Sequence, residues 1–406
     1  MSSARRSLAM MRRTALGVSI GWIGLSMLAD GVPALLLPHR LLADGITDAT
    51  TLGMTALLAI ALAAVVQPFA GAWSDRIGRF PIVVLGTAVA GAGLALLLVA
   101  AGVVIGTVLA LVGASIAQAG YQPLMPARVG ERWRGRASGL KGAFDVAGAF
   151  VGFILIGAML AAGSDLGAVA IVAAVLVSGF MAARLLLGRD EGRTPGTPSE
   201  SASFETGERQ ALVAMIAARF LFLLGVYVVG RFLVLFMAER LGLGADDAAA
   251  QAGVAFAVLA GITVVASVPA GWLSDHVGRR PLLLLGGAIA AAGVALLTTA
   301  ATSAEILLYG SLMAIGSAAF GSASWALLGD LVAGPAAGRL LGLANLGTAG
   351  AAAAAGVFGI LIDARGFGPA FAIAAAACLL GGLVAWAIPA SPWRPARLVD
   401  RVEAVG

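Results

Sequence analysis

The chain has 406 residues, of which 60% are hydrophobic and 12% charged, and its mean hydropathy is +0.99. So little charge excludes a soluble globular protein, which needs a larger polar surface. Uncharged stretches such as 81–104 and 282–304 exceed the roughly 20 residues that a helix needs to cross a bilayer. A transmembrane β-barrel is excluded as well, because its strands alternate over short segments. The composition therefore predicts an all-α polytopic membrane protein.

Twelve transmembrane helices are predicted, in chain order at about 14–38, 49–72, 81–102, 104–126, 137–161, 166–187, 211–238, 248–271, 281–301, 305–328, 340–362 and 368–388. The first run is too long for a cleaved signal peptide and contains Asp30. Cys378 is the single cysteine, so no disulfide framework is expected. His39 and His276 fall at opposite ends of this topology, and no metal-ligand cluster, phosphate loop or nucleophile elbow occurs. We therefore expect no bound metal, no cofactor and no enzymatic activity.

The arginines predict the orientation. Twenty of them fall in the tails and even-numbered loops, whereas three, Arg40, Arg240 and Arg365, fall on the other side. Because positively charged loops remain in the cytoplasm, both termini are predicted to be cytoplasmic. Membrane topology also explains the net charge of +5 without a nucleic-acid partner. We expect a multi-pass protein of the cell (inner or plasma) membrane.

The two halves of the chain repeat each other. Residues 66–97 align without a gap on residues 266–297, which brings GAWSDRIGRF (71–80) onto GWLSDHVGRR (271–280). Residues 188–208 are rich in Pro, Gly, Ser and Thr, a composition typical of a flexible linker. The expected organisation is a six-helix bundle at 1–187, a cytoplasmic linker at 188–209, a second six-helix bundle at 210–390 and a cytoplasmic tail at 391–406.

Two parallel six-helix repeats, a linker and the turn G-x-x-x-D-[RK]-x-G-[RK]-[RK] between spans 2 and 3 together resemble the major facilitator superfamily. The resemblance covers essentially the whole chain, and the turn recurs between spans 8 and 9. It implies two bundles related by a pseudo-two-fold axis along the membrane normal. It also implies a secondary transporter that works by alternating access, as a monomer in the lipid bilayer. Its partners would be a small-molecule substrate and a proton as the coupling ion.

The repeated turn is a candidate gate. Its glycines permit close helix contact and a tight turn, and its aspartates can approach a facing helix N-terminus. By resemblance, Asp75 would meet the start of span 11 near Arg339 when the cytoplasmic side is closed. The alternative is a solvated loop without a gating role. The candidate gate residues are Gly71, Asp75, Arg76, Gly78, Arg79, Gly271, Asp275, Gly278, Arg279, Arg280, Asp330 and Arg339.

Charges inside predicted spans are candidates for substrate or ion binding. Asp30 in span 1 and Arg231 in span 7 lie at matching depth in the two repeats. By resemblance both spans line the cavity, so the two charges face it, with or without a direct pair. In the alternative, Asp30 packs within its own half and Arg231 finds backbone carbonyls. Asp30 is the predicted coupling residue, because a carboxylate can change its charge whereas an arginine effectively cannot.

Span 5 carries a second pair, Lys141 and Asp145, four residues apart on one helix face. Lys141 is the only lysine among 26 basic residues. The pair is either part of the coupling site, with Asp145 as the second choice after Asp30, or a self-neutralising pair that fixes span 5. Arg219 is expected to extend to the cytoplasmic interface.

Polar and amphipathic side chains in spans 4, 10 and 11 are either substrate contacts or helix–helix contacts: Gln118, Tyr121, Trp325 and Asn345. Drug–proton antiporters of the superfamily carry a Gly-Pro signature in span 5, but Phe153 stands at the place of that proline. A drug/proton efflux antiporter, a sugar-type proton symporter and an uncoupled facilitator all stay open. A receptor or scaffold that does not transport is less favoured.

Overall fold

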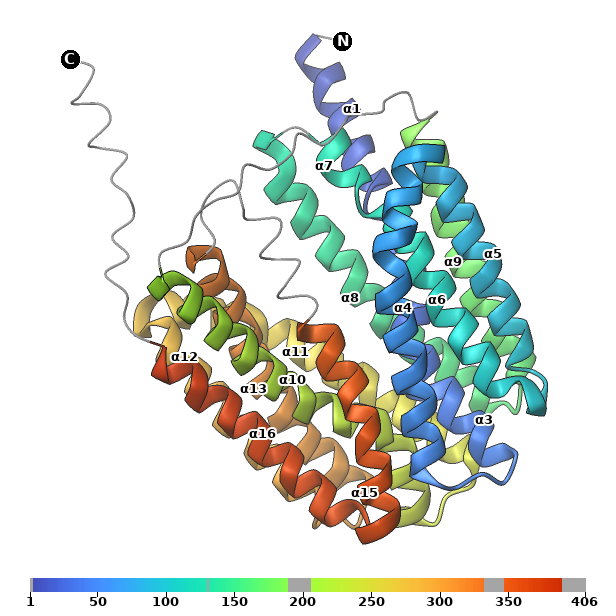
Figure 1. The fold of residues 1–406 in the computed structure, drawn as a ribbon, viewed down its shortest axis with the longest axis vertical. Helices are drawn as coiled ribbons and strands as arrows, with labels where there is room; N and C mark the ends of the chain where they lie inside the picture. Colours follow the sequence, from blue (N-terminus) through green and yellow to red (C-terminus); the bar gives the residue numbers. More distant parts are fainter. Residues whose placement is uncertain (1–2, 130, 189–205, 332–346, 389–406) are drawn as a thin grey trace.

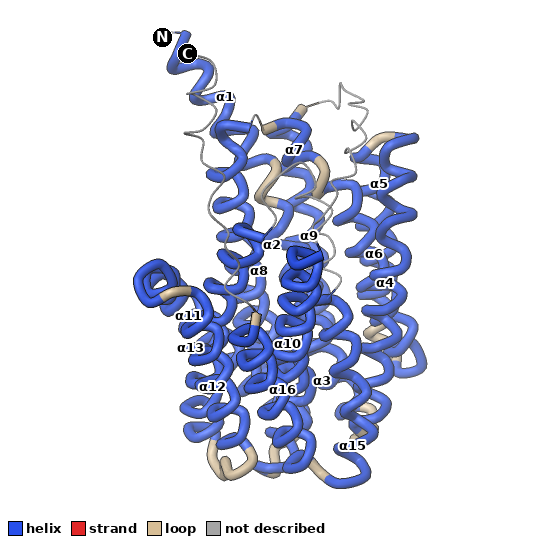
Figure 2. The backbone as a smooth tube through the Cα atoms, turned by 60° about the vertical axis from the view of Figure 1, so that its left-hand side comes forward, coloured by secondary structure: helices blue, strands red, loops and turns tan. Residues whose placement is uncertain are grey.

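The computed structural model describes residues 3–129, 131–188, 206–331 and 347–388. Within these ranges the chain forms helices joined by short loops and contains no strand (Figure 2). Twelve of its helical segments are long and apolar enough to cross a membrane. The predicted all-α fold with twelve spans is confirmed.

The first span is interrupted, where the sequence predicted one continuous helix. It consists of α1 (Ser3–Gly17), α2 (Gly21–Gly31), the π-helix η1 (Val32–Leu36) and α3 (Leu37–Ala43). Pro33 and Pro38 lack a backbone N–H, so regular α-helical hydrogen bonding cannot continue through this stretch. The N–H of Leu37 instead donates to the carbonyl of Val32, five residues back. The wider turn leaves carbonyl oxygens free for groups on other helices.

The other elements follow in two matching series. The first half continues with α4 (Ala49–Ile77), α5 (Arg79–Leu96), η2 (Ala100–Gly102), α6 (Val103–Tyr121), α7 (Leu124–Arg128), α8 (Glu131–Ala161) and α9 (Asp165–Leu187). The second half has α10 (Thr206–Leu241), α11 (Ala245–Val277), α12 (Arg279–Leu297), α13 (Ser303–Leu331), the span Gly347–Arg365 with η3 (Ala355–Val357) and α15 (Phe358–Arg365), and α16 (Phe367–Ala387). The two six-span halves lie side by side (Figure 1).

The internal repeat is visible in the packing of the helices. The backbone of α5 contacts that of α6, and α12 contacts α13 in the same way. A Cβ atom on Gly86 would lie 2.2 Å from the backbone nitrogen of Ala117, and one on Gly286 would lie 2.7 Å from that of Phe320. Small residues at helix interfaces allow such close approach within a membrane. Glycine at the same position of the repeat therefore allows the equivalent pair of helices to pack closely in each half.

The candidate gate turns also match. Gly78 ends α4 with φ 104°, and Gly278 ends α11 with φ 97°. Such positive φ values favour glycine, because other residues are strained there. The tight turn predicted for both glycines is confirmed. We call the end of the molecule with these turns, defined by Arg76 and Arg279, the arginine end.

The described contacts between the halves lie from mid-molecule to the opposite end, which we define by His39 and Asp363 and call the Asp363 end. There α4 packs against η3 and α15, and α11 packs against α8 and α3. Figure 1 shows α3 and α15 at this end, where the two halves meet. Among the described residues, a Cβ atom on Gly71 or Gly271 would meet no heavy atom within 4 Å. The close helix contact predicted at these two glycines therefore stays a prediction.

Candidate functional site

A row of polar side chains connects α2 with α8. Trp22, Ser26 and Asp30 are four residues apart and share one face of α2. Ser26 Oγ donates a hydrogen bond to Oδ1 of Asp145 on α8. Lys141 Nζ lies 3.2 Å from Oδ2 of Asp145 and 3.7 Å from the centroid of the Trp22 ring. The charges that the sequence placed in spans 1 and 5 thus form one polar row, made of these five residues.

Asp30 ends this row. Its side chain is exposed, and among the described residues it forms no hydrogen bond and no ion pair within 4 Å. Its electrostatic partners are Asp145 on α8 and Arg231 on α10 in the other half. The carboxylate thus interacts with a like charge in its own half and with an opposite charge in the other half. A carboxylate without a fixed partner in this setting is suited to gain and lose a proton.

Arg231 faces the interrupted first span from the second half. The residue is buried, with 7% exposed, and its Nη1 donates to the carbonyl oxygen of Pro33 at 3.4 Å. The π-helical turn of η1 makes that carbonyl available. Arg231 thus contacts a backbone carbonyl, and the predicted cavity role of the two charges stays a prediction. Asp30 interacts with Arg231 electrostatically, without a direct ion pair.

Tyr227 belongs to the same site, although sequence reasoning did not single it out. It lies on α10 four residues before Arg231, on the same face of the helix. It interacts electrostatically with Asp30 of the first half as well as with Arg231. The chain has three tyrosines, and this spacing from an intramembrane arginine is the signal that would have found it. Tyr227 thus adds a hydroxyl group that interacts with charges of both halves.

The second half has its own cation–aromatic contact. Arg219 on α10 donates from Nη1 to Oγ of Ser324 on α13 at 2.6 Å, and its guanidinium carbon lies 4.3 Å from the Trp325 ring centroid. The expectation that Arg219 extends to the interface is wrong, because only 5% of it is exposed. Trp325 itself is 45% exposed. It therefore presents an open indole face in the second half, and its role as a substrate contact stays a prediction.

Tyr121 is a helix–helix contact in this conformation. It is fully buried, its hydroxyl accepts from the backbone N–H of Gly21 at 3.0 Å, and it donates to the carbonyl of Gly17 at 2.7 Å. Both hydrogen bonds stabilise the break between α1 and α2. Gln118, one turn earlier on α6, is half-buried. Asn345 lies outside the described residues.

The gate residues at the arginine end are only partly described. Asp75 and Asp275 are exposed, and Arg279 donates from Nη1 to the carbonyl of Ala326 on α13 at 2.7 Å. Arg339 and the side chain of Asp330 lie outside the described residues. The predicted meeting of Asp75 with the start of span 11 therefore stays a prediction.

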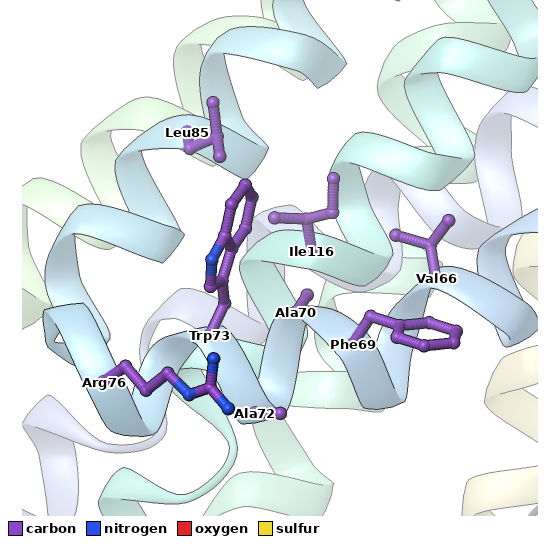
Figure 3. A pocket seen from close by; sticks show the side chains of 8 residues that line it. All are labelled: Val66, Phe69, Ala70, Ala72, Trp73, Arg76, Leu85 and Ile116. Atoms are coloured by element: carbon purple, nitrogen blue, oxygen red, sulfur yellow. The ribbon is translucent and has the colours of Figure 1, made fainter.

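Figure 3 shows a pocket of about 420 Å³ in the first half at the arginine end. Its lining is apolar except for one guanidinium group: Val66, Phe69, Ala70, Ala72, Trp73 and Arg76 from α4, Leu85 from α5 and Ile116 from α6. The Trp73 ring lies between the α4 and α5 ribbons, with Arg76 at the side (Figure 3). None of the polar-row residues lines this pocket, so it is a separate feature from the candidate ion and substrate site.

Asp363 links the halves at the opposite end. Its two carboxylate oxygens accept from the backbone N–H groups of Ala49 at 2.8 Å and Thr50 at 2.7 Å. These groups form the first turn of α4, and a carboxylate is favoured at a helix N-terminus. The helices also touch through their backbones, since a Cβ atom on Gly53 would lie 2.0 Å from the carbonyl oxygen of Gly356. This contact joins the two halves at the Asp363 end and closes the molecule there.

Substitution of Asp363 is expected to weaken that closure. Asp363→Asn removes a carboxylate from a helix N-terminus, an interaction worth about 0.3–2 kcal/mol, and should lower the ratio of closed to open molecules roughly 2- to 30-fold. Spin labels on the exposed residues Ala162 and Ala364, which belong to different halves, report this ratio by electron-electron double resonance. Asp48→Asn is the matched control. Asp48 caps the same helix through Thr51 at 2.8 Å but bridges no halves, so an equal shift there would contradict the assignment.

Comparisons with known proteins agree on one family. The family model described as Major Facilitator Superfamily matches residues 20–266 and 215–403. The xylose transporter XylE from E. coli, inward open, is 16% identical, with 98% of this chain and 99% of that chain covered and a TM-score of 0.70. A bacterial homologue of the human lysosomal transporter Spinster, inward-facing and occupied, is 15% identical, with 95% and 94% covered and a TM-score of 0.68.

A bacterial homologue of the iron transporter ferroportin is similar in two states. The inward-facing structure is 18% identical, with 95% of this chain and 98% of that chain covered and a TM-score of 0.69. The outward-facing structure is 16% identical, with 93% and 98% covered and a TM-score of 0.62. No curated protein matches the sequence. The family match spans both halves, and the chain belongs to the major facilitator superfamily.

Proposed function

We propose that the chain is a secondary active transporter that moves a small molecule across the membrane by alternating access, with a proton as the coupling ion. The observation that carries this proposal is Asp30, a carboxylate that forms no ion pair among the described residues and interacts electrostatically with Arg231 of the other half. The halves contact each other toward one end only, as far as the structure describes them. The charge of Asp30 within the membrane, together with contact between the halves at one end, supports a transporter that opens alternately to the two sides of the membrane.

The orientation follows from the arginines. With the arginine end in the cytoplasm, the Asp363 end faces outward, and the described contacts between the halves suit a state that is open to the inside. The higher TM-score to the inward-facing ferroportin homologue, 0.69 against 0.62 for the outward-facing one, supports this assignment. The proposed organisation is a bundle at 1–187, a linker at 188–209, a bundle at 210–390 and a tail at 391–406, in the cell membrane as a monomer.

Proton coupling is favoured over uncoupled facilitation. A facilitator needs no titratable group between its halves, and an intramembrane carboxylate is costly to retain without a function. The polar row and the contact between Arg219 and Trp325 offer charges of both signs and aromatic surface, which suits a polar organic substrate. Sugar-type proton symport and drug/proton antiport both fit these groups. A flux assay is therefore needed to determine whether substrate and proton move in the same or in opposite directions.

Reconstitution tests the proposal. A thermal-shift screen of sugars, organic anions and cationic amphiphiles against the purified chain identifies a ligand. Its flux into liposomes is then measured with and without a proton gradient. We expect accumulation that requires the gradient. Equilibration at the same rate and to the same level in both conditions would identify an uncoupled facilitator instead, and the absence of any flux would favour a receptor.

Asp75 provides a prediction for the arginine end. Asp75→Asn should leave membrane insertion unchanged and shift the balance toward the inward-open state. The substitution removes a charge that faces a helix N-terminus when the cytoplasmic side is closed, worth roughly 0.3–2 kcal/mol. Labels on the exposed residues Leu185 and Val277 measure the separation of the halves at this end. Asp275→Asn, at the repeat-related position, is measured in parallel for comparison. If Asp75→Asn leaves both the separation of the halves and transport unchanged, Asp75 is not part of the gate.

A further inference from the structure

His39 bridges the two halves near the Asp363 end. The residue is buried on α3, with 2% exposed. Its Nε2 lies 2.7 Å from Oδ1 of Asp246 in the first turn of α11, which belongs to the second half. Its Nδ1 lies 3.4 Å from Oδ1 of Asp165 in the first turn of α9, which belongs to its own half. One imidazole ring therefore stands between carboxylates of different halves.

Only a doubly protonated ring suits both carboxylates. A neutral imidazole carries a single N–H, so its other nitrogen would direct a lone pair toward a carboxylate oxygen. A buried polar group without a complementary partner costs free energy. Nδ1 has no hydrogen bond among the described residues and only the ion-pair contact with Asp165. The contact between the halves is therefore best satisfied when His39 is an imidazolium.

The charged surroundings of His39 are more acidic than basic. Arg40 is the cation beside it, and it pairs with Asp165 and lies 3.5 Å from Asp44. Arg240 on α10 donates instead to the carbonyl of Ala300 at 2.7 Å. The remaining charged groups at this end of the elements packed against α3 are Asp48, Glu239 and Asp247. A proton on His39 thus reduces an excess of negative charge.

The two interhalf contacts at this end explain why a histidine stands here. The N-terminus of α4 accepts a carboxylate, Asp363, beside its own N-cap Asp48, whose carboxylate accepts from the N–H of Thr51. The first turn of α11 contains Asp246 and Asp247. Another carboxylate there would be repelled, whereas a cation is attracted. At this second contact a positively charged partner from the first half is therefore favoured over a carboxylate.

We propose that His39 is a proton-binding site that controls the Asp363 end, so that proton uptake closes this end and proton loss permits it to open. Opening would carry Asp246 away with the second half and leave Asp165 and Arg40 with the first. Acid at the Asp363 end thus favours the conformation of this structure. The inference rests on the proposed alternating access, and it adds a proton site separate from Asp30.

Spin labels on Ala162 and Ala364 test the proposal without a substrate. The measurement uses an Asp30→Asn background, which removes the other proton linked to the movement of the halves. As the pH falls from about 8 to about 5, the ratio of closed to open molecules should rise by up to about tenfold per pH unit, the limit for one linked proton. In the same background His39→Gln, which keeps a side-chain N–H but cannot become charged, should abolish this dependence. Asp246→Asn should reduce it, because it removes the carboxylate of the other half.

His276→Gln is the matched control. The chain has two histidines, and His276 is exposed at the arginine end, where its Nδ1 lies 2.8 Å from the carbonyl oxygen of Trp272. In the Asp30→Asn background this variant should keep the pH dependence. The proposal is overturned if His39→Gln keeps it or if His276→Gln loses it. If neither the wild type nor Gly53→Leu opens at the Asp363 end at any pH, alternating access itself is wrong and the inference falls with it.

Discussion

Asp30→Asn is expected to abolish proton-driven accumulation of substrate while substrate binding and exchange remain measurable. Asparagine has nearly the same shape as aspartate but cannot bind and release a proton. In the structure the Asp30 carboxylate has no fixed hydrogen bond among the described residues, and it lies between the charges of Asp145 and Arg231. Relative motion of the halves changes its distance from Arg231, and with it the preference for the charged form. A neutral side chain removes that link between the proton and the conformation.

The measurement compares accumulation against a gradient with counterflow exchange in the same liposomes. Glu305→Gln is the matched control, because Glu305 lies at the start of α13 outside the polar row, where it accepts from the backbone N–H groups of Ala301 and Thr302. It should accumulate substrate as the wild type does. If Asp30→Asn concentrates substrate at the wild-type rate, Asp30 is not the coupling residue. Asp145 then becomes the candidate, since it is held by Ser26 and Lys141 in the same row.

The fold was predictable because its determinants are local in sequence. Apolar run length predicts each span, and arginine distribution predicts which loops share a side. The shift of 200 residues brings Gly78 onto Gly278, and both have positive φ as expected. The break in the first span was missed because hydropathy averages over a window and does not register hydrogen bonding. Pro33 and Pro38 are the residues that signal it.

The site was predictable only in part, because its contacts join residues distant in sequence. Asp30, Lys141 and Asp145 stand out as charges within apolar runs, yet nothing in either run shows that Ser26 connects them. Arg219 looked like an interfacial residue because it lies near the start of its span. Its actual contact with Ser324 and Trp325 depends on how α10 packs against α13. The sequence predicts how deep a residue lies along its own helix, but it does not predict which helix that residue will contact.

Gly53→Leu is expected to prevent closure at the Asp363 end and to abolish transport. A Cβ atom on Gly53 would lie 2.0 Å from the carbonyl oxygen of Gly356 in the other half, and one on Gly356 would lie 2.1 Å from that of Gly53. Both obstacles are backbone atoms, which cannot turn aside as a side chain can. The conflict exists only while the halves touch, so it destabilises the closed state more than the open one. Overpacking typically costs about 1–3 kcal/mol, which corresponds to roughly a 5- to 150-fold loss of closed molecules.

The labels on Ala162 and Ala364 should accordingly report a larger separation in Gly53→Leu, with loss of flux in liposomes. Gly91→Leu is the matched control, because a Cβ atom on Gly91 meets no heavy atom within 4 Å. It should show the wild-type distance distribution and wild-type flux, which separates closure from a general effect of added volume. Gly356→Leu approaches the same contact from the other half and should reproduce the Gly53→Leu phenotype. Wild-type flux in both interface variants would mean that transport does not require this closure, and α4 would then be a passive part of the fold.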